Sequence, residues 1–165
     1  MKKLNIALVA QDARKQELLD WCTHNAQWLS KHTLFGTGTT AKLLSNIAVL
    51  NDSNLSEKAI TSSWYMMPLS IKPLLSGPLG GDQQIGAMIA EGKIDVLIFF
   101  CDNLITQGHQ QDVSALSRLA SLYNIAFATN RTTADLIITS NLITDENYNR
   151  IVPTVIENYK NRFEK

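Results

Sequence analysis

The chain has no excess of charge of either sign, because its 15 Lys and Arg residues balance its 15 Asp and Glu residues. It also has no cluster of basic residues, so the electrostatic attraction that supplies most non-specific affinity for nucleic acids is missing. The longest uninterrupted apolar run, residues 96–101, is far shorter than the ~20 residues that span a bilayer. We therefore expect no nucleic-acid partner and no membrane-spanning segment.

Cysteine and histidine are scarce, with two and three residues respectively. Cys22 and Cys101 lie far apart and form neither a CxxC motif nor a Cys/His spacing suited to zinc. His24 and His32 fall on or near the first predicted helix, so His109 stands alone among the candidate site loops. We expect no metal and no other cofactor, and the cysteine usage favours a cytoplasmic location.

Short apolar runs alternate with stretches of helical spacing along the chain. Strands are predicted at residues 4–10, 33–36, 96–100, 125–128 and 151–152. Helices are predicted at residues 18–29, 41–50, 85–89, 113–123 and 154–163, and residues 134–138 fit either type. The run 96–100 is apolar without alternation, which is typical of a strand buried on both faces and predicts the central strand.

This alternation predicts an α/β fold in which a doubly wound, mostly parallel sheet carries helices on both faces. We expect a single domain over residues 1–165. Ligands bind such sheets beyond the carboxyl ends of the strands. The candidate loops are therefore those that follow strands, at residues 11–15, 37–40, 76–82 and 101–112.

The first two loops carry groups suited to binding a phosphate. Asp12 and Lys15 are three residues apart in the first loop, and the second loop surrounds a helix start with small hydroxyl residues. The second loop reads Thr37-Gly38-Thr39-Thr40. Simple helix capping by Asp12 or by a threonine is the structural alternative in each loop.

The other two loops carry groups suited to proton transfer. In the third loop, three glycines and a proline surround Asp82, which indicates a backbone bent for close approach to Asp82 and to the Ser76 and Gly77 amides. The fourth loop begins with Asp102 and ends with His109 and Asp112. Helix capping by Asp82 or Asp112 remains the alternative. Together the four loops indicate acid/base chemistry on a small phosphorylated molecule.

Several segments also resemble the methylglyoxal synthase family over nearly the whole chain. They are IALVAQDARKQ (6–16), TGTTAKLL (37–44), LSGPLGGDQQIGAMIAEGKIDVLIFF (75–100), the residues Asp102, His109 and Asp112, and ATNRTTAD (128–135). The resemblance implies conversion of dihydroxyacetone phosphate to methylglyoxal and inorganic phosphate, without a metal. It also implies a homohexamer that phosphate inhibits.

The resemblance further implies roles for individual residues. Asp82 becomes the catalytic base, His109 the group that polarises an oxygen, and Asp102 and Asp112 aspartates near the active site. Arg162 matches, over a shorter stretch, an arginine linked to communication between subunits. The implied substrate and phosphate contacts are Gln11, Asp12, Lys15, Thr37, Gly38, Thr39, Thr40, Ser76 and Gly77.

The sequence departs from the family pattern in two places. Gln11 stands where the family motif has histidine, and its amide donates a hydrogen bond without the charge assistance of an imidazolium. This departure bears on affinity, pH dependence and activity. The chain also has an extra segment at about residues 50–69, in which Trp64 and Tyr65 are followed by two methionines.

A non-catalytic regulatory domain of the same fold, which binds a phosphorylated ligand, is the alternative function. Fold alone does not separate the two. Such a domain has no need of a full acid/base set, whereas this chain has Asp82, Asp102, His109 and Asp112. The synthase is therefore the favoured interpretation.

Overall fold

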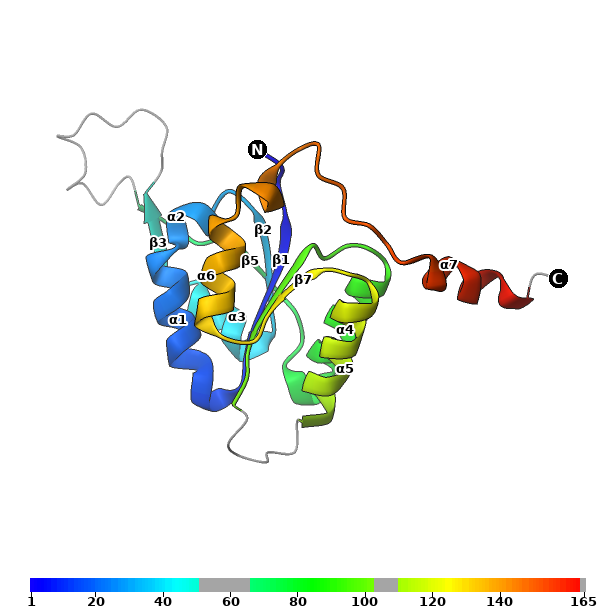
Figure 1. Ribbon diagram of the computed structural model, residues 1–165. Helices are drawn as coiled ribbons and strands as arrows, with labels where there is room; N and C mark the ends of the chain where they lie inside the picture. The colour runs from blue at the N-terminus through cyan, green and yellow to red at the C-terminus, as the bar shows by residue number, and fades with distance from the viewer. Residues whose placement is uncertain (51–65, 103–109, 164–165) are drawn as a thin grey trace.

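The computed structural model describes residues 1–50, 66–102 and 110–163. Its centre is a five-stranded sheet in the order β5-β2-β1-β6-β7 (Figure 1). The strands are β1 (Asn5–Ala10), β2 (Thr33–Gly36), β5 (Ile71–Pro73), β6 (Val96–Phe100) and β7 (Ala126–Ala128). All neighbouring strands in this sheet run parallel, as the alternation of strands and helices predicts.

Two layers of helices cover the two faces of the sheet, which confirms the predicted fold class. One layer contains α1 (Lys15–His24), α2 (Ala26–Leu29), α3 (Gly38–Leu44) and α6 (Arg131–Thr139). The other contains α4 (Gly81–Ala90) and α5 (Gln110–Leu122). Short 3-10 turns follow or precede these helices at Asp12–Arg14, Gly77–Leu79 and Asn141–Thr144, and another lies near the C-terminus at Asn161–Phe163.

Successive residues of β1 enter two different hydrophobic cores. Ile6 and Leu8 pack in the core under α1, whereas Ala7 and Val9 pack in the core under α4 and α5. Alternate side chains of a strand point to opposite faces of the sheet, so a strand covered on both sides must be apolar throughout. This requirement explains the uninterrupted apolar runs of β1 and β6.

The prediction that residues 96–100 form the central strand is wrong, because β1 occupies the middle of the sheet and β6 lies beside it. Both strands are interior and buried on both faces, so their apolar patterns do not show which of the two is central. The segment at residues 134–138, which fitted either type, lies within α6. The first predicted helix is interrupted at Asn25, between α1 and α2.

The helix predicted at residues 41–50 is also partly wrong. Helix α3 ends at Leu44, and β3 (Ala48–Leu50) pairs antiparallel with β4 (Met66–Pro68). Residues 47–50 have the apolar spacing of a helix, but they lie beyond the end of α3 and lead into β3. Strand β4 lies within the extra segment expected at about residues 50–69, and Trp64 and Tyr65 of that segment lie outside the described residues.

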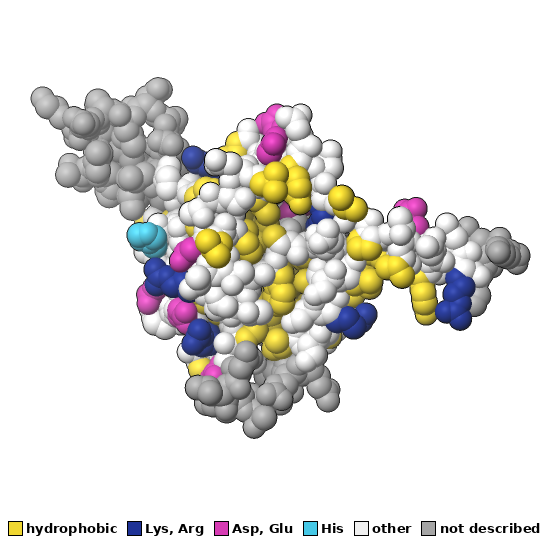
Figure 2. All heavy atoms as spheres, in the orientation of Figure 1, with side chains coloured by type: hydrophobic (Ala, Val, Ile, Leu, Met, Phe, Trp, Pro, Cys, Tyr) yellow, Lys and Arg dark blue, Asp and Glu magenta, His cyan; other side chains and the backbone are white. Residues whose placement is uncertain are grey.

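The C-terminal region forms an arm that projects from the body (Figure 1). No strand forms at residues 151–152, contrary to prediction; these residues lead through Pro153, which has no N–H for a sheet, into α7 (Thr154–Lys160). Figure 2 shows hydrophobic side chains along the arm. Ile151, Val155 and Tyr159, which belong to this arm, are exposed. In the described part of the chain, no helix is both long and apolar enough to cross a membrane.

His32 is a buried imidazole beside the start of β2. Its Nδ1 accepts a hydrogen bond from the Leu4 N–H at 3.2 Å, and its ring lies 4.2 Å from the Trp28 ring, centroid to centroid. Burial, together with the charges of Lys3 and Lys31, lowers the pKa of His32 to about 4. The folded protein therefore keeps this imidazole neutral at pH values where the unfolded chain protonates it.

We expect the free energy of unfolding to fall as the pH decreases from about 6.5 towards about 4. His32→Asn keeps an acceptor oxygen near the position of Nδ1 but cannot take up a proton. The wild type should therefore lose stability relative to this variant over that pH range, by on the order of 1–3 kcal/mol. Urea unfolding at several pH values measures the difference, and parallel curves would contradict the assignment.

Candidate active site

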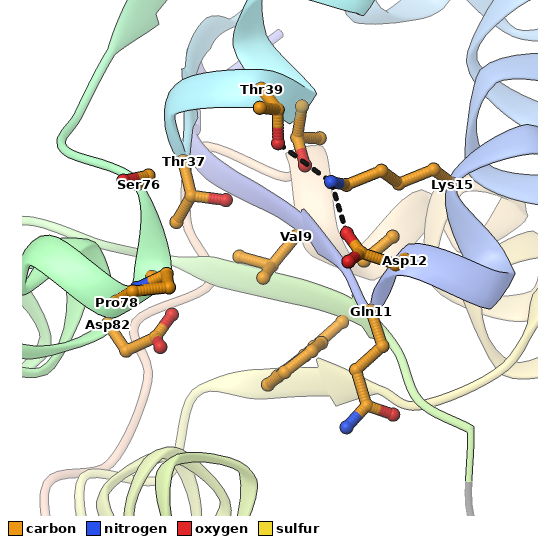
Figure 3. A pocket seen from close by; sticks show the side chains of 13 residues that line it. Val9, Gln11, Asp12, Lys15, Thr37, Thr39, Ser76, Pro78 and Asp82 are labelled. Atoms are coloured by element: carbon orange, nitrogen blue, oxygen red, sulfur yellow. Dashed lines mark hydrogen bonds and ion pairs between the residues drawn. The ribbon is translucent and has the colours of Figure 1, made fainter. Parts of the chain in front are cut away.

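The carboxyl edge of the sheet holds a cavity of about 340 Å³. Val9, Ala10 and Phe99 lie at the ends of β1 and β6 and form part of its wall (Figure 3). Predicted residues from three of the four candidate loops line the rest of it. These residues are Gln11, Asp12, Lys15, Thr37, Thr39, Thr40, Ser76, Gly77 and Asp82.

Lys15 is held between two neighbouring loops at one side of the cavity. Its Nζ donates hydrogen bonds to Asp12 Oδ1 at 2.5 Å and to Thr39 Oγ1 at 2.7 Å (Figure 3). Asp12 is part of a 3-10 turn rather than its N-cap, so the predicted capping alternative is wrong for Asp12. The two bonds fix a positive charge at the start of α3, where an anion is favoured.

Thr37 and Thr40 place hydroxyl groups deep in the cavity. Thr37 occupies the N-cap position of α3, but its side chain makes no capping hydrogen bond. Thr40 is buried, and its Oγ1 has no hydrogen-bond partner among the described residues. A buried hydroxyl without a partner costs roughly 1–3 kcal/mol, so a polar ligand at this place recovers part of that cost.

Gly38 determines how closely the second and third loops approach each other. Its N–H donates to the Leu75 carbonyl at 3.1 Å. A Cβ on Gly38 would lie 3.0 Å from the Ser76 nitrogen, which is closer than side chains normally approach. Gly38 therefore contributes a close contact between the loops rather than a side chain in the cavity.

Asp82 lies across the cavity from Lys15, and its carboxylate faces the interior in Figure 3. It is 8% exposed and is the second residue of α4. The N-cap position belongs to Gly80, whose φ of 101° suits glycine, so the capping alternative is wrong for Asp82. A Cβ on Gly77 would lie 3.1 Å from Asp82 Oδ2, so glycine leaves this carboxylate oxygen accessible.

Gln11 connects the ends of β1 and β6. Its N–H donates to the Phe100 carbonyl at 3.1 Å, and its Oε1 accepts a hydrogen bond from the Asp102 N–H. The half-buried Asp102 thus begins the fourth loop at a fixed position beside the cavity. Because the amide oxygen binds Asp102, the amide NH₂ group of Gln11 is the part suited to contact a ligand.

The remaining predicted site residues are described less fully or lie elsewhere. His109 lies outside the described residues, so the fourth loop is known at its two ends. Asp112 is the third residue of α5 and therefore does not occupy the N-cap position. Arg162 lies on the C-terminal arm, with its guanidinium 5.3 Å from the centre of the Tyr159 ring.

Cys101 lies directly after β6, at the edge of the sheet that carries the cavity, a position where a thiolate could act as a nucleophile. Its Sγ donates to the Phe99 carbonyl at 3.2 Å, and burial raises the pKa of the thiol to about 11 despite the charge of Arg14. It therefore remains a thiol at neutral pH. Among the described residues, no three His, Cys, Asp or Glu side chains are grouped as metal ligands would be.

Sequence reasoning missed the apolar part of the cavity. Val9 and Phe99 belong to buried strand ends, and Pro78 lies in the 3-10 turn before α4. An apolar pattern indicates burial without distinguishing core from cavity wall. For Val9 and Phe99, a position near the end of a strand is the signal that could have identified them.

The parallel sheet and the cavity at its carboxyl edge place the chain among α/β proteins that bind small molecules in the loops after their strands. A family model described as "MGS-like domain" matches residues 66–129. This match covers β4 through β7, including the loop that carries Asp82.

Comparison with known proteins identifies the family. A methylglyoxal synthase from Oleidesulfovibrio alaskensis is 47% identical over 142 residues, which cover 86% of this chain and 84% of the relative. A methylglyoxal synthase from Pectobacterium atrosepticum is 50% identical over 138 residues, which cover 84% and 78%. The chain belongs to the methylglyoxal synthase family, and the resemblance seen in its sequence is confirmed.

A solved structure agrees with this assignment. The crystal structure of methylglyoxal synthase from Elizabethkingia anophelis matches with a TM-score of 0.76 and 36% sequence identity. The match covers 99% of this chain and 91% of that chain. The likeness therefore extends over the whole fold and includes the strand ends that form the cavity.

Replacing Thr40 by valine tests whether its hydroxyl serves a ligand. Valine has nearly the same shape, so Thr40→Val should leave the free energy of unfolding unchanged or raise it, because an unpaired buried hydroxyl is removed. Binding of inorganic phosphate should weaken by about tenfold, as expected for loss of one hydrogen bond to a charged group. Calorimetric titration and urea unfolding give the two quantities. Lower stability with unchanged phosphate binding would assign the hydroxyl a purely structural role.

Proposed function

We propose that the chain converts dihydroxyacetone phosphate into methylglyoxal and inorganic phosphate, with Asp82 as the catalytic base. The lyase activity follows from membership of the methylglyoxal synthase family. One observation carries the assignment of the base: the buried carboxylate of Asp82 faces, across one cavity, a lysine held for anion binding. This arrangement lets one end of a small molecule be anchored while the other end meets a base.

The phosphate group binds at the side of the cavity formed by α1 and α3. Lys15 supplies a charge-assisted hydrogen bond, and the hydroxyls of Thr37 and Thr40 supply further donors to the phosphate oxygens. Ser76 and Gly77 contact the same end of the substrate from the third loop. The distribution of these donors over three loops fixes the orientation of the phosphate as well as its position.

Asp82 takes a proton from the carbon that bears the free hydroxyl, and an enediolate forms. The electrons of the enediolate then expel the phosphate from the adjacent carbon as its C–O bond breaks. The resulting enol takes up a proton and becomes methylglyoxal. Elimination requires this C–O bond to stand perpendicular to the enediolate plane, so the donors that hold the phosphate also control the outcome.

Polar groups beside the base stabilise the negative charge on the enediolate oxygens. We assign His109 to this role on the family resemblance, which also assigns Asp102 and Asp112 to the active site. Gln11 contributes its amide NH₂ group, since its amide oxygen binds the Asp102 N–H. These assignments make the β1–β6 end of the cavity the part that contacts the reacting oxygens.

Phosphate is a product and fits the same anion site, so we propose that it inhibits the reaction there and that its effect passes between subunits allosterically, as the family resemblance implies. The buried, unpaired cysteines Cys22 and Cys101 support a location in the cytoplasm.

We also propose that the chain assembles as a homohexamer and that the C-terminal arm takes part in the contacts. Ile151 is 77% exposed and Tyr159 is 65% exposed, on an arm that projects from the body (Figure 1). Large apolar side chains on a projecting element favour burial against another copy. Arg162, on the same arm, is then placed to contact a neighbouring subunit, in line with the role implied for it.

The role of Asp82 is tested by replacing it with asparagine. The purified protein and Asp82→Asn are incubated with dihydroxyacetone phosphate and a metal chelator, and methylglyoxal and free phosphate are measured together. The wild type should release both products equally. The variant should be slower by about 10³-fold or more, because a general base is lost, while its affinity for inorganic phosphate stays within about threefold.

Asp20→Asn, at an exposed position of α1, is the control. Retained turnover in Asp82→Asn at saturating substrate would refute the assignment.

The role of the arm is tested by the double variant Val155→Asp, Tyr159→Asp. Two charges on the exposed apolar side chains of α7 should disfavour burial and reduce the oligomer mass measured by light scattering. Asn158→Asp adds charge at an exposed polar position of the same helix and should leave the mass unchanged. If the double variant keeps the wild-type mass, the arm does not form the contact.

A further inference from the structure

Leu75 links three elements of the site through its backbone. Its side chain is 48% exposed, so packing does not explain its position. Its N–H donates to Gln84 Oε1 at 2.8 Å, and its carbonyl accepts from the Gly38 N–H at 3.1 Å. The first bond reaches α4, which carries Asp82, and the second reaches the start of α3, which carries the threonine hydroxyls.

The backbone around Leu75 is tightly packed. A Cβ on Gly81 would lie 2.0 Å from the Leu75 carbonyl oxygen, so glycine alone fits there. The Ser76 carbonyl accepts hydrogen bonds from both the Leu79 and the Gly81 N–H groups. The backbone around Leu75 is therefore held tightly against the start of α4.

We propose that Gln84 is a positioning residue that sets the distance between the base and the phosphate-binding loops. It lies two residues after Asp82 on α4, and its side chain bridges nine residues back to Leu75. Because a helix is stiff, fixing Gln84 to Leu75 also fixes Asp82 relative to the second and third loops. This role rests on the proposed function, in which Asp82 must reach one carbon while the phosphate is held elsewhere.

Such a bond affects the chemical step more than binding. Lys15 on α1 and Thr39 on α3 are joined by a hydrogen bond that does not involve Gln84. The anion side of the cavity therefore keeps its geometry when Gln84 changes. The base, by contrast, loses a bond that restrains its helix. A misplacement of about 1 Å can cost roughly 10²-fold in rate. We therefore expect kcat to fall while the KM and the inhibition constant of phosphate change little.

The test compares variants at two adjacent exposed positions of α4. Gln84→Met keeps a long, unbranched side chain but removes the acceptor, whereas Gln84→Glu retains an acceptor oxygen. Gln83→Met and Gln83→Glu are matched controls for helix propensity and for added charge near Asp82. Initial rates with dihydroxyacetone phosphate give kcat and KM, inhibition by inorganic phosphate gives its constant, and thermal unfolding gives Tm.

We expect kcat to fall by about tenfold or more in Gln84→Met and to stay within about threefold in Gln84→Glu, relative to the matched Gln83 variants. KM and the phosphate inhibition constant should stay within about threefold in all four. An unchanged kcat in Gln84→Met, or a raised KM at unchanged kcat, would overturn the positioning role. So would failure of Gln84→Glu to restore kcat. An inactive wild type would instead refute the proposed function itself, which keeps the two failures distinct.

Discussion

Strands β1, β2, β5 and β6 run in the same direction, so the loops that follow them meet at one edge of the sheet. Covering both faces with helices forces the interior strands to be apolar, which leaves their ends and the following loops as the places for polar chemistry. The lysine, the threonine hydroxyls and the buried carboxylate all depend on this constraint. Had one of these strands run antiparallel, its loop would lie at the opposite edge.

Lys15 and Asp82 lie on different elements at opposite sides of the cavity. Lys15 is held on α1 against α3, whereas Asp82 is carried by α4 on the other side of the sheet. Separation matters because a lysine bonded directly to a carboxylate would stabilise its charged form and weaken it as a proton acceptor, which is the role proposed for Asp82. Asp12 accepts a hydrogen bond from Lys15 instead, which fixes the cation on its own side of the cavity.

The sequence predicted those features of the molecule that depend on local pattern. The apolar runs of β1 and β6 and the glycines around Asp82 each have a direct local cause, and the structure contains them. The order of the strands was not predictable, because β1 and β6 are equally buried. The early end of α3 was missed, since residues 47–50 suit a strand and a helix alike. The wall formed by Val9 and Phe99 was missed because cavity and core require the same side chains.

Gln11 joins the ends of β1 and β6 at the edge of the cavity. Its Oε1 accepts the Asp102 N–H and so extends the contact between β1 and β6 beyond the strands, a role that needs an acceptor but no charge. Its NH₂ group cannot carry the positive charge of an imidazolium at that place. Among the described residues that line the cavity, Lys15 is then the sole cation, and its two hydrogen bonds hold it where that charge is required. Among these residues, the positive charge of the cavity is thus concentrated at the start of α3, across the cavity from Asp82.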